Sequence, residues 1–261
     1  MTMKAQLKRM CAGVAVLLTA TAAHAGTNSH WQAPLAPPAS TDSVASPLGV
    51  LGWSDNFDSY VTGSQIHTQG GWKGWFNNPA AGALVSDLQA SSVPNSVEIL
   101  GATDLVRPFT GYTSGVWILS ARQFIPSTFA GESYFIVQNR YNDAGTDLSW
   151  STQVIYDSAT GTVANDGGVS PGSASYVTDA WADLRLVIDL DADLQTFFYN
   201  GTPVYSGTWT AQFVPNMGSG PGTLTIGALN LFANGASAVY YDDASLRSDS
   251  IFANGFDSIP F

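Results

Sequence analysis

The sequence predicts an all-β protein built from antiparallel strands, and three observations support this fold class. Residues 184–190 are apolar at every second position, which is the period of a β-strand. Asn200-Gly201 lies between two β-rich runs and is typical of a tight hairpin turn. Turn residues recur about every ten to fifteen positions, a spacing that favours a sandwich or barrel over alternating strands and helices.

The composition agrees with this class. The chain holds 26 Gly and 13 Pro, and 12% of its residues are aromatic while only 11% are charged. Such a balance is typical of turn-rich β proteins that are secreted.

Residues 181–209 carry the clearest strand pattern, and we expect them to lie at the centre of the domain. The alternating run ends at Asp191-Ala192-Asp193, and an aromatic and β-branched strand follows at 196–199. The Asn200-Gly201 turn then leads into a third short strand. Elsewhere, the same reasoning predicts strands at 84–85, 96–100, 116–124, 134–138, 150–156, 162–163, 224–231 and 238–246.

The two ends of the chain lack the strand pattern of its middle. Residues 1–25 have a basic start, a short apolar run from 11 to 20 and the Ala-x-Ala cleavage signal Ala23-His24-Ala25, which predict a signal peptide. Residues 26–50 form a Pro-, Ser- and Ala-rich segment that we interpret as a flexible leader. The domain therefore spans 51–248, residues 249–261 form a tail, and the mature protein is expected to be secreted, either extracellular or periplasmic.

Charge and cysteine content narrow the possible partners. The single cysteine, Cys11, lies in the predicted signal peptide, so the mature chain would have no disulfide and no thiolate chemistry. Removal of the signal leaves six basic against 20 acidic residues, a net charge of −14. This charge argues against binding to nucleic acid or to an anionic membrane and is compatible with neutral glycans or cations.

Three segments together resemble the concanavalin A-like lectin/glucanase superfamily, and the laminin-G-like jelly rolls most of all. They are Asp-Asn-Phe-Asp at 55–58, the hairpin at 181–201 and Tyr-Tyr-Asp-Asp-x-x-Leu at 240–246. The resemblance implies a two-sheet antiparallel jelly-roll β-sandwich over 51–248, in which one sheet often binds a glycan. The tail at 251–257 resembles the Ile-Phe-x-x-Gly-Phe-Asp ending found on many secreted proteins of gammaproteobacteria.

Two groups of residues are candidate ligand contacts. Trp72 and Trp75 lie in a glycine-rich loop, where exposed rings would stack on the apolar faces of sugars. Trp150, on an alternating strand, is a further stacking candidate that would line a concave sheet. The alternative for all three rings is that they belong to the core. Asn139, Arg140 and Tyr141 follow an apolar strand, where they would either hydrogen-bond sugar hydroxyls or form an ordinary polar turn.

Acidic residues near the two ends of the domain are candidates for a structural Ca²⁺ site, which the resemblance implies for some members. Hard carboxylate oxygens are the ligands that Ca²⁺ prefers. The alternative is that these acids are solvated turn and edge charges, and the same two interpretations apply to a second cluster, Asp189, Asp191 and Asp193. The predicted ligands are Asp55, Asp58, Asp242 and Asp243.

The sequence favours a protein without catalysis. The mature chain has two glutamates, Glu98 and Glu132, and lacks the Glu-x-Asp-x-x-Glu motif of the glycoside hydrolases in this superfamily. It also lacks a Gly-x-Ser-x-Gly elbow, and its domain has one histidine, His67. We therefore expect a carbohydrate-binding protein for neutral glycans. A surface module that binds protein and a diverged polysaccharide hydrolase or lyase remain as alternatives.

Overall fold

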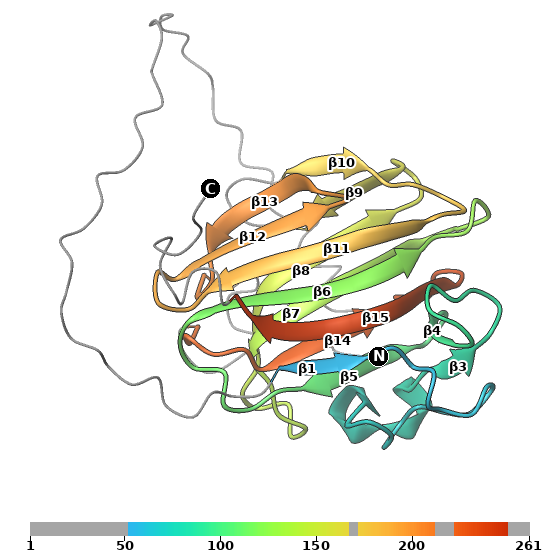
Figure 1. Ribbon diagram of the computed structural model, residues 1–261, viewed down its shortest axis with the longest axis horizontal. Coiled ribbons are helices and arrows are strands. Elements are labelled where there is room, and N and C mark those ends of the chain that lie inside the picture. Colours follow the sequence, from blue (N-terminus) through green and yellow to red (C-terminus); the bar gives the residue numbers. More distant parts are fainter. Residues whose placement is uncertain (1–51, 167–171, 212–221, 250–261) are drawn as a thin grey trace, which may run out of the picture. The chain divides into compact units, whose positions relative to one another are not determined.

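The computed structural model describes residues 52–166, 172–211 and 222–249. Within these ranges the strands form two antiparallel sheets (Figure 1). The predicted signal peptide, the leader and all but the first residue of the predicted tail lie outside the described residues. Among the described residues, no helix has the length and apolar character that a membrane span needs.

The first sheet, sheet A, contains the last strand of the domain near its middle. That strand, β15 (Val239–Ser248), pairs with β6 (Val116–Phe124) along one side. Its other side pairs first with β4 (Ser96–Ile99) and then with β1 (Trp53–Asp55). The strand order is β13 (Thr202–Thr208), β12 (Leu194–Tyr199), β11 (Trp181–Asp189), β6, β15, β4 and β3 (Leu84–Ser86).

The second sheet, sheet B, is centred on β7 (Glu132–Arg140), which lies between β8 (Ser149–Asp157) and β14 (Ala228–Phe232). The strand order is β10 (Ser173–Ser175), β9 (Thr162–Asn165), β8, β7, β14, β5 (Asp104–Pro108) and β2 (Lys73–Gly74). Two short 3₁₀ turns, η1 (Trp75–Asn77) and η2 (Pro79–Ala81), follow β2 directly.

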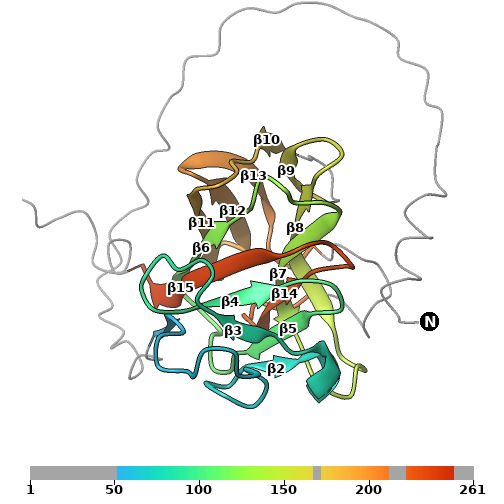
Figure 2. The ribbon, with the colours of Figure 1, turned by 90° about the vertical axis from the view of Figure 1, so that its right-hand side faces the viewer.

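The two sheets face each other across one apolar core (Figure 2). Phe135 of sheet B lies with its ring 6.1 Å from the ring of Phe197 and 6.3 Å from that of Tyr241, both in sheet A. The expected alternation is also present, because Leu184, Leu186 and Ile188 are all buried in this core. The predicted all-β, two-sheet antiparallel jelly-roll sandwich is therefore confirmed.

The 181–209 stretch folds as predicted but lies in a different place. Its three strands are β11, β12 and β13, and Asn200 and Gly201 make the hairpin turn with φ angles of 46° and 75°. It forms one side of sheet A and ends at the edge strand β13, whereas β6 and β15 hold the middle. Strand β5 is absent from the prediction, because Arg107 and Pro108 interrupt its short apolar run.

Candidate functional site

The face of sheet B that points away from the core carries its own set of side chains, and we call it the outer face. Strand alternation separates the two sides of β7, because Phe135 and Val137 lie in the main core while Tyr134 and Ile136 lie in a second apolar cluster. That second cluster also contains Trp75 and Trp150. The outer face is therefore partly apolar, unlike the solvent-facing side of an ordinary surface sheet.

An aromatic cluster of Trp75, Phe76, Tyr141 and Trp150 lies on the outer face. The ring centroid of Trp75 is 4.7 Å from that of Phe76, 5.1 Å from that of Tyr141 and 6.0 Å from that of Trp150. Trp75 and Trp150 are buried, while Phe76 and Tyr141 remain half-buried. The two tryptophans thus support a pair of rings that keep part of their surface open to solvent.

Local backbone geometry brings Trp75 over the sheet. Directly after β2, Phe76 and Asn77 adopt positive φ angles of 55° and 57°, which reverse the chain. The side chain of Asn78 then accepts a hydrogen bond from the Ala80 backbone N–H at 3.0 Å and begins η2. This short turn holds the rings of Trp75 and Phe76 against residues of β8 and the loop after β7.

Charged groups border the aromatic cluster. The Tyr141 hydroxyl accepts a hydrogen bond from the Phe76 backbone N–H at 3.1 Å and donates one to Asp143 at 3.0 Å. Asp143 also forms a 2.6 Å ion pair with Lys73, whose ammonium lies 5.7 Å from the centre of the Tyr141 ring. Burial raises the pKa of Tyr141, so its hydroxyl stays protonated and available for hydrogen bonding.

The structure brings three of the six predicted ligand residues together: Trp75, Tyr141 and Trp150. Arg140 is committed to an ion pair with Asp147 at 3.1 Å. Asn139 is buried, and its amide donates to Ser151 at 2.8 Å and accepts from the Thr223 N–H at 3.2 Å. Its hydrogen bonds hold neighbouring segments together instead of facing solvent.

Trp72 requires a correction, because the loop does not display it. Its ring is fully buried in the main core, 5.6 Å from Trp53 and 5.7 Å from Phe57, and its indole N–H donates to Asp55 at 2.9 Å. Of the two interpretations given for Trp72, Trp75 and Trp150, burial therefore holds for all three. No open ring face remains on Trp72 for a sugar.

The four predicted calcium ligands are engaged by donors from the protein itself. Asp242 accepts hydrogen bonds from the Ser91 and Ser92 backbone N–H groups at 2.7 and 2.9 Å. Asp243 accepts from the Ser91 hydroxyl at 2.9 Å. The remaining two, Asp55 and Asp58, accept from the backbone N–H groups of Phe57 and Asn95.

These carboxylates do not fit a shared Ca²⁺, because within the described ranges no three His, Cys, Asp or Glu side chains gather where they could hold a metal ion. Calcium binding is thus a prediction of the sequence alone, and the arrangement of these carboxylates argues against it. In the second cluster, Asp189 accepts from the Asp191 and Ala192 N–H groups and Asp193 accepts from Thr210, as turn acids do.

The two glutamates of the domain lie on opposite sheets. Glu98 is in β4 of sheet A and accepts from the Tyr240 hydroxyl at 3.0 Å, whereas Glu132 is in β7 of sheet B and accepts from Tyr134 and Asn234. His67 accepts from the Gly74 N–H through Nδ1 at 3.1 Å and helps to hold the glycine-rich loop.

Comparison with solved structures finds chains that resemble part of this fold. It is similar to a sialidase with a TM-score of 0.50 and 10% identity, over 76% of this chain and 18% of that chain. The chain is less similar to the Caenorhabditis elegans galectin LEC-6, with a TM-score of 0.39 and 13% identity over 57% of this chain and 95% of that chain. A Trypanosoma rangeli sialidase in complex with the inhibitor DANA follows at TM-score 0.43 and 16% identity, over 63% and 27% of the two chains.

This chain spans less than one fifth of the length of the first sialidase. At such identities the likeness concerns the fold. No family model matches the chain, and no curated protein matches it.

Proposed function

We propose that this protein is an exported bacterial carbohydrate-binding protein of the concanavalin A-like, laminin-G-like type, which binds neutral glycans without altering them. The predicted signal peptide and the tail at 249–261 support export to the periplasm or the medium. A lectin-like role also agrees with a jelly-roll sandwich that carries an aromatic surface on one sheet.

The observation that carries this proposal is the pair of half-buried rings, Phe76 and Tyr141, on the outer face of sheet B. A sugar ring has apolar C–H faces and a polar rim, so it needs an aromatic surface with hydrogen-bonding groups beside it. The Lys73–Asp143 pair supplies such groups next to the rings. The buried Trp75 and Trp150 hold the rings in position, which lowers the ordering cost of binding.

The charge of the protein supports neutral over polyanionic glycans. A mature net charge of −14 repels polyuronates and nucleic acids at a distance. The charges beside the aromatic cluster cancel, because Lys73 and Asp143 form an ion pair.

Affinity electrophoresis of the exported protein tests the proposal against a panel of neutral polysaccharides. We expect retardation by at least one of them, and Tyr141→Ala should weaken binding by about tenfold, or ~1.4 kcal/mol. Phe198→Ala is the matched control, because Phe198 is also half-buried beneath a cation, Arg185 at 4.1 Å, but lies on sheet A.

Two outcomes would overturn the proposal. Absence of retardation by every neutral polysaccharide, together with capture of an envelope protein through the same surface, would support the adhesive module instead. Release of reducing sugar, or new ultraviolet absorbance from cleaved polysaccharide, would support a hydrolase or lyase.

A further inference from the structure

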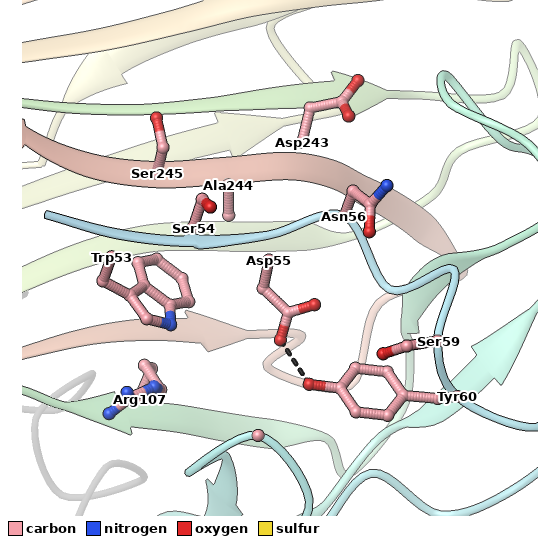
Figure 3. Close-up of a pocket in the computed structure, with 11 residues that line it drawn as sticks. Trp53, Ser54, Asp55, Asn56, Ser59, Tyr60, Arg107, Asp243, Ala244 and Ser245 are labelled. Carbon is pink, nitrogen blue, oxygen red and sulfur yellow. Dashed lines mark hydrogen bonds between the residues drawn. The ribbon is translucent and has the colours of Figure 1, made fainter.

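A polar pocket lies at the side of the sandwich, between β1 of sheet A and β5 of sheet B (Figure 3). Its volume is about 730 Å³. Residues from β1, β5 and β15 line it together with the loops at 59–60 and 70. The pocket thus joins segments that are nearly 200 positions apart in the sequence, and it is separate from the aromatic cluster on the outer face.

Asp55 organises one wall of the pocket. Its Oδ1 accepts from the Phe57 N–H at 2.9 Å, and its Oδ2 accepts from the Tyr60 hydroxyl at 2.5 Å and from the Trp72 indole at 2.9 Å. Three donors therefore spread and offset the negative charge of this carboxylate. Figure 3 shows the Asp55–Tyr60 hydrogen bond at the edge of the pocket.

Arg107 supplies the positive charge. Its guanidinium lies 5.3 Å from the ring of Trp53 and 5.5 Å from that of Phe109. Its Nη1 donates to the Pro108 carbonyl oxygen, but the buried Nε has no hydrogen-bond partner and Arg107 forms no ion pair within the described residues. Among the described residues that line the pocket, it is the one basic side chain.

The glycine pair before Trp72 allows the pocket to form. A Cβ on Gly70 would lie 1.8 Å from the Tyr60 hydroxyl oxygen, and one on Gly71 would lie 2.8 Å from Cζ of Arg107. Both glycines also have positive φ angles, 55° and 80°. The loop can therefore press its backbone against Tyr60 and Arg107, which fixes the position of the guanidinium.

We propose that this pocket binds a single acidic sugar unit, with the sugar carboxylate on Arg107 and its hydroxyl groups on the polar side chains of the pocket wall. Asp55 offsets part of the charge of this half-buried guanidinium, but among the described residues no carboxylate lies within ion-pair distance of it, so one ligand carboxylate can pair with it directly. Its planar set of donors matches a carboxylate. The hydroxyl and amide groups of Ser54, Asn56 and Ser59 suit a hydroxylated ligand.

The acidic residues around the pocket favour a ligand with one carboxylate over a phosphate group or a polyanion. Asp55 and Asp243 both line the pocket, so a dianion would face repulsion at short range. The net charge of −11 for the whole chain opposes a long polyuronate in the same way. A single uronic acid at the end of an otherwise neutral glycan avoids both penalties.

The first experiment uses the exported wild-type protein and a matched pair of sugars. D-glucuronate and D-glucose differ only in the carboxylate at C6, so titration calorimetry or saturation-transfer NMR isolates its contribution. We expect glucuronate to bind at least tenfold more tightly, and the preference should shrink as salt rises from 0.05 to 0.5 M, since salt screens the charge. Equal binding of the two sugars would overturn the proposal without any variant.

A pair of arginine variants tests the residue. Arg107→Gln should abolish the preference for glucuronate, whereas Arg122→Gln should retain it, because Arg122 pairs with Asp183 at 3.0 Å on sheet A. Thermal unfolding of each variant checks that it is folded. A folded Arg107→Gln protein that still prefers glucuronate would exclude Arg107 as the binding group.

The two proposed sites can be tested independently of each other. Tyr141→Ala should leave glucuronate binding unchanged, and Arg107→Gln should leave binding of neutral polysaccharide unchanged. Loss of both activities in either variant would show a single shared site and contradict this second pocket.

Discussion

Gln138 and Trp150 lie directly opposite each other on β7 and β8, and both bury polar atoms without a hydrogen-bond partner among the described residues. Both amide atoms of Gln138 and the indole nitrogen of Trp150 are in this state. Buried polar groups are nearly always hydrogen-bonded in folded proteins. The outer face of sheet B therefore includes a polar pair that costs stability in the sandwich as it stands.

Replacement of Gln138 by Leu should stabilise the protein. Leu removes two buried polar atoms at nearly the same volume, so we expect the free energy of unfolding to rise by about 1 kcal/mol. Gln195→Leu is the control, because Gln195 is equally buried but donates to the Ser151 and Thr208 carbonyl oxygens. That change should lower the free energy by about 2 kcal/mol. Urea unfolding measures both, and equal losses in the two variants would mean that Gln138 is hydrogen-bonded in solution.

Two glycines, Gly63 and Gly70, allow the cost of backbone strain to be separated from the cost of a steric clash. Gly63 and Gly70 both have positive φ, but a Cβ on Gly63 would meet no atom within 4 Å whereas one on Gly70 would strike the Tyr60 hydroxyl. Gly63→Ala should cost about 1 to 2 kcal/mol from backbone strain alone. Gly70→Ala should cost about 1 to 3 kcal/mol more, because it overfills the pocket wall. Thermal unfolding compares them, and similar losses would show that close approach at Gly70 is unimportant.

Asp242 should make stability depend on pH. Its side chain is fully buried, and burial, with a smaller contribution from Asp243, raises its pKa to about 6, although backbone N–H groups oppose the shift. Because the folded pKa exceeds the unfolded value, the contribution is fully present below the unfolded pKa and is lost as pH rises through 6.

We expect the protein to lose roughly 2 kcal/mol of stability from this group between about pH 4 and 7. Asp242→Asn removes the titration, so its stability curve should be flatter than that of the wild type over this range. Parallel curves from denaturant titrations at each pH would contradict the shifted pKa.

Calcium is a separate test. Because the four candidate carboxylates accept hydrogen bonds from the protein and form no cluster within the described residues, we expect the same unfolding midpoint with millimolar Ca²⁺ and with chelator. A ligand that binds the folded state must raise the midpoint. A calcium-dependent rise that Asp55→Asn abolishes would restore the metal site that the sequence predicts.

The sequence predicted most strands because alternation is a local property. Strand 116–124 was predicted to the residue, and the Asn200-Gly201 turn follows from the low cost of positive φ at these two residues. The positions of the tryptophan rings, in contrast, depend on contacts with residues far away in the sequence. Trp72 and Trp75 share one loop, yet Trp72 lies in the main core, where it packs on Trp53 and donates its N–H to Asp55, 17 positions earlier.

The pocket was beyond prediction for the same reason. Arg107 belongs to a strand that alternation did not reveal, and two other residues that line the pocket, Trp53 and Asp243, come from opposite ends of the domain. One signal was present in the sequence. An arginine within an otherwise apolar run, Leu105-Val106-Arg107, is unusual unless it packs against rings or binds a partner.

The position of β15 determines when sheet A can be completed. Strands β1, β4 and β6 all pair with this final strand. A growing chain that has not yet reached residue 239 therefore leaves β1 without a partner and leaves one side of β4 and of β6 unpaired. Pairing over such sequence distances is slow to nucleate. Sheet A is therefore completed only after nearly the whole length of the domain has been synthesised.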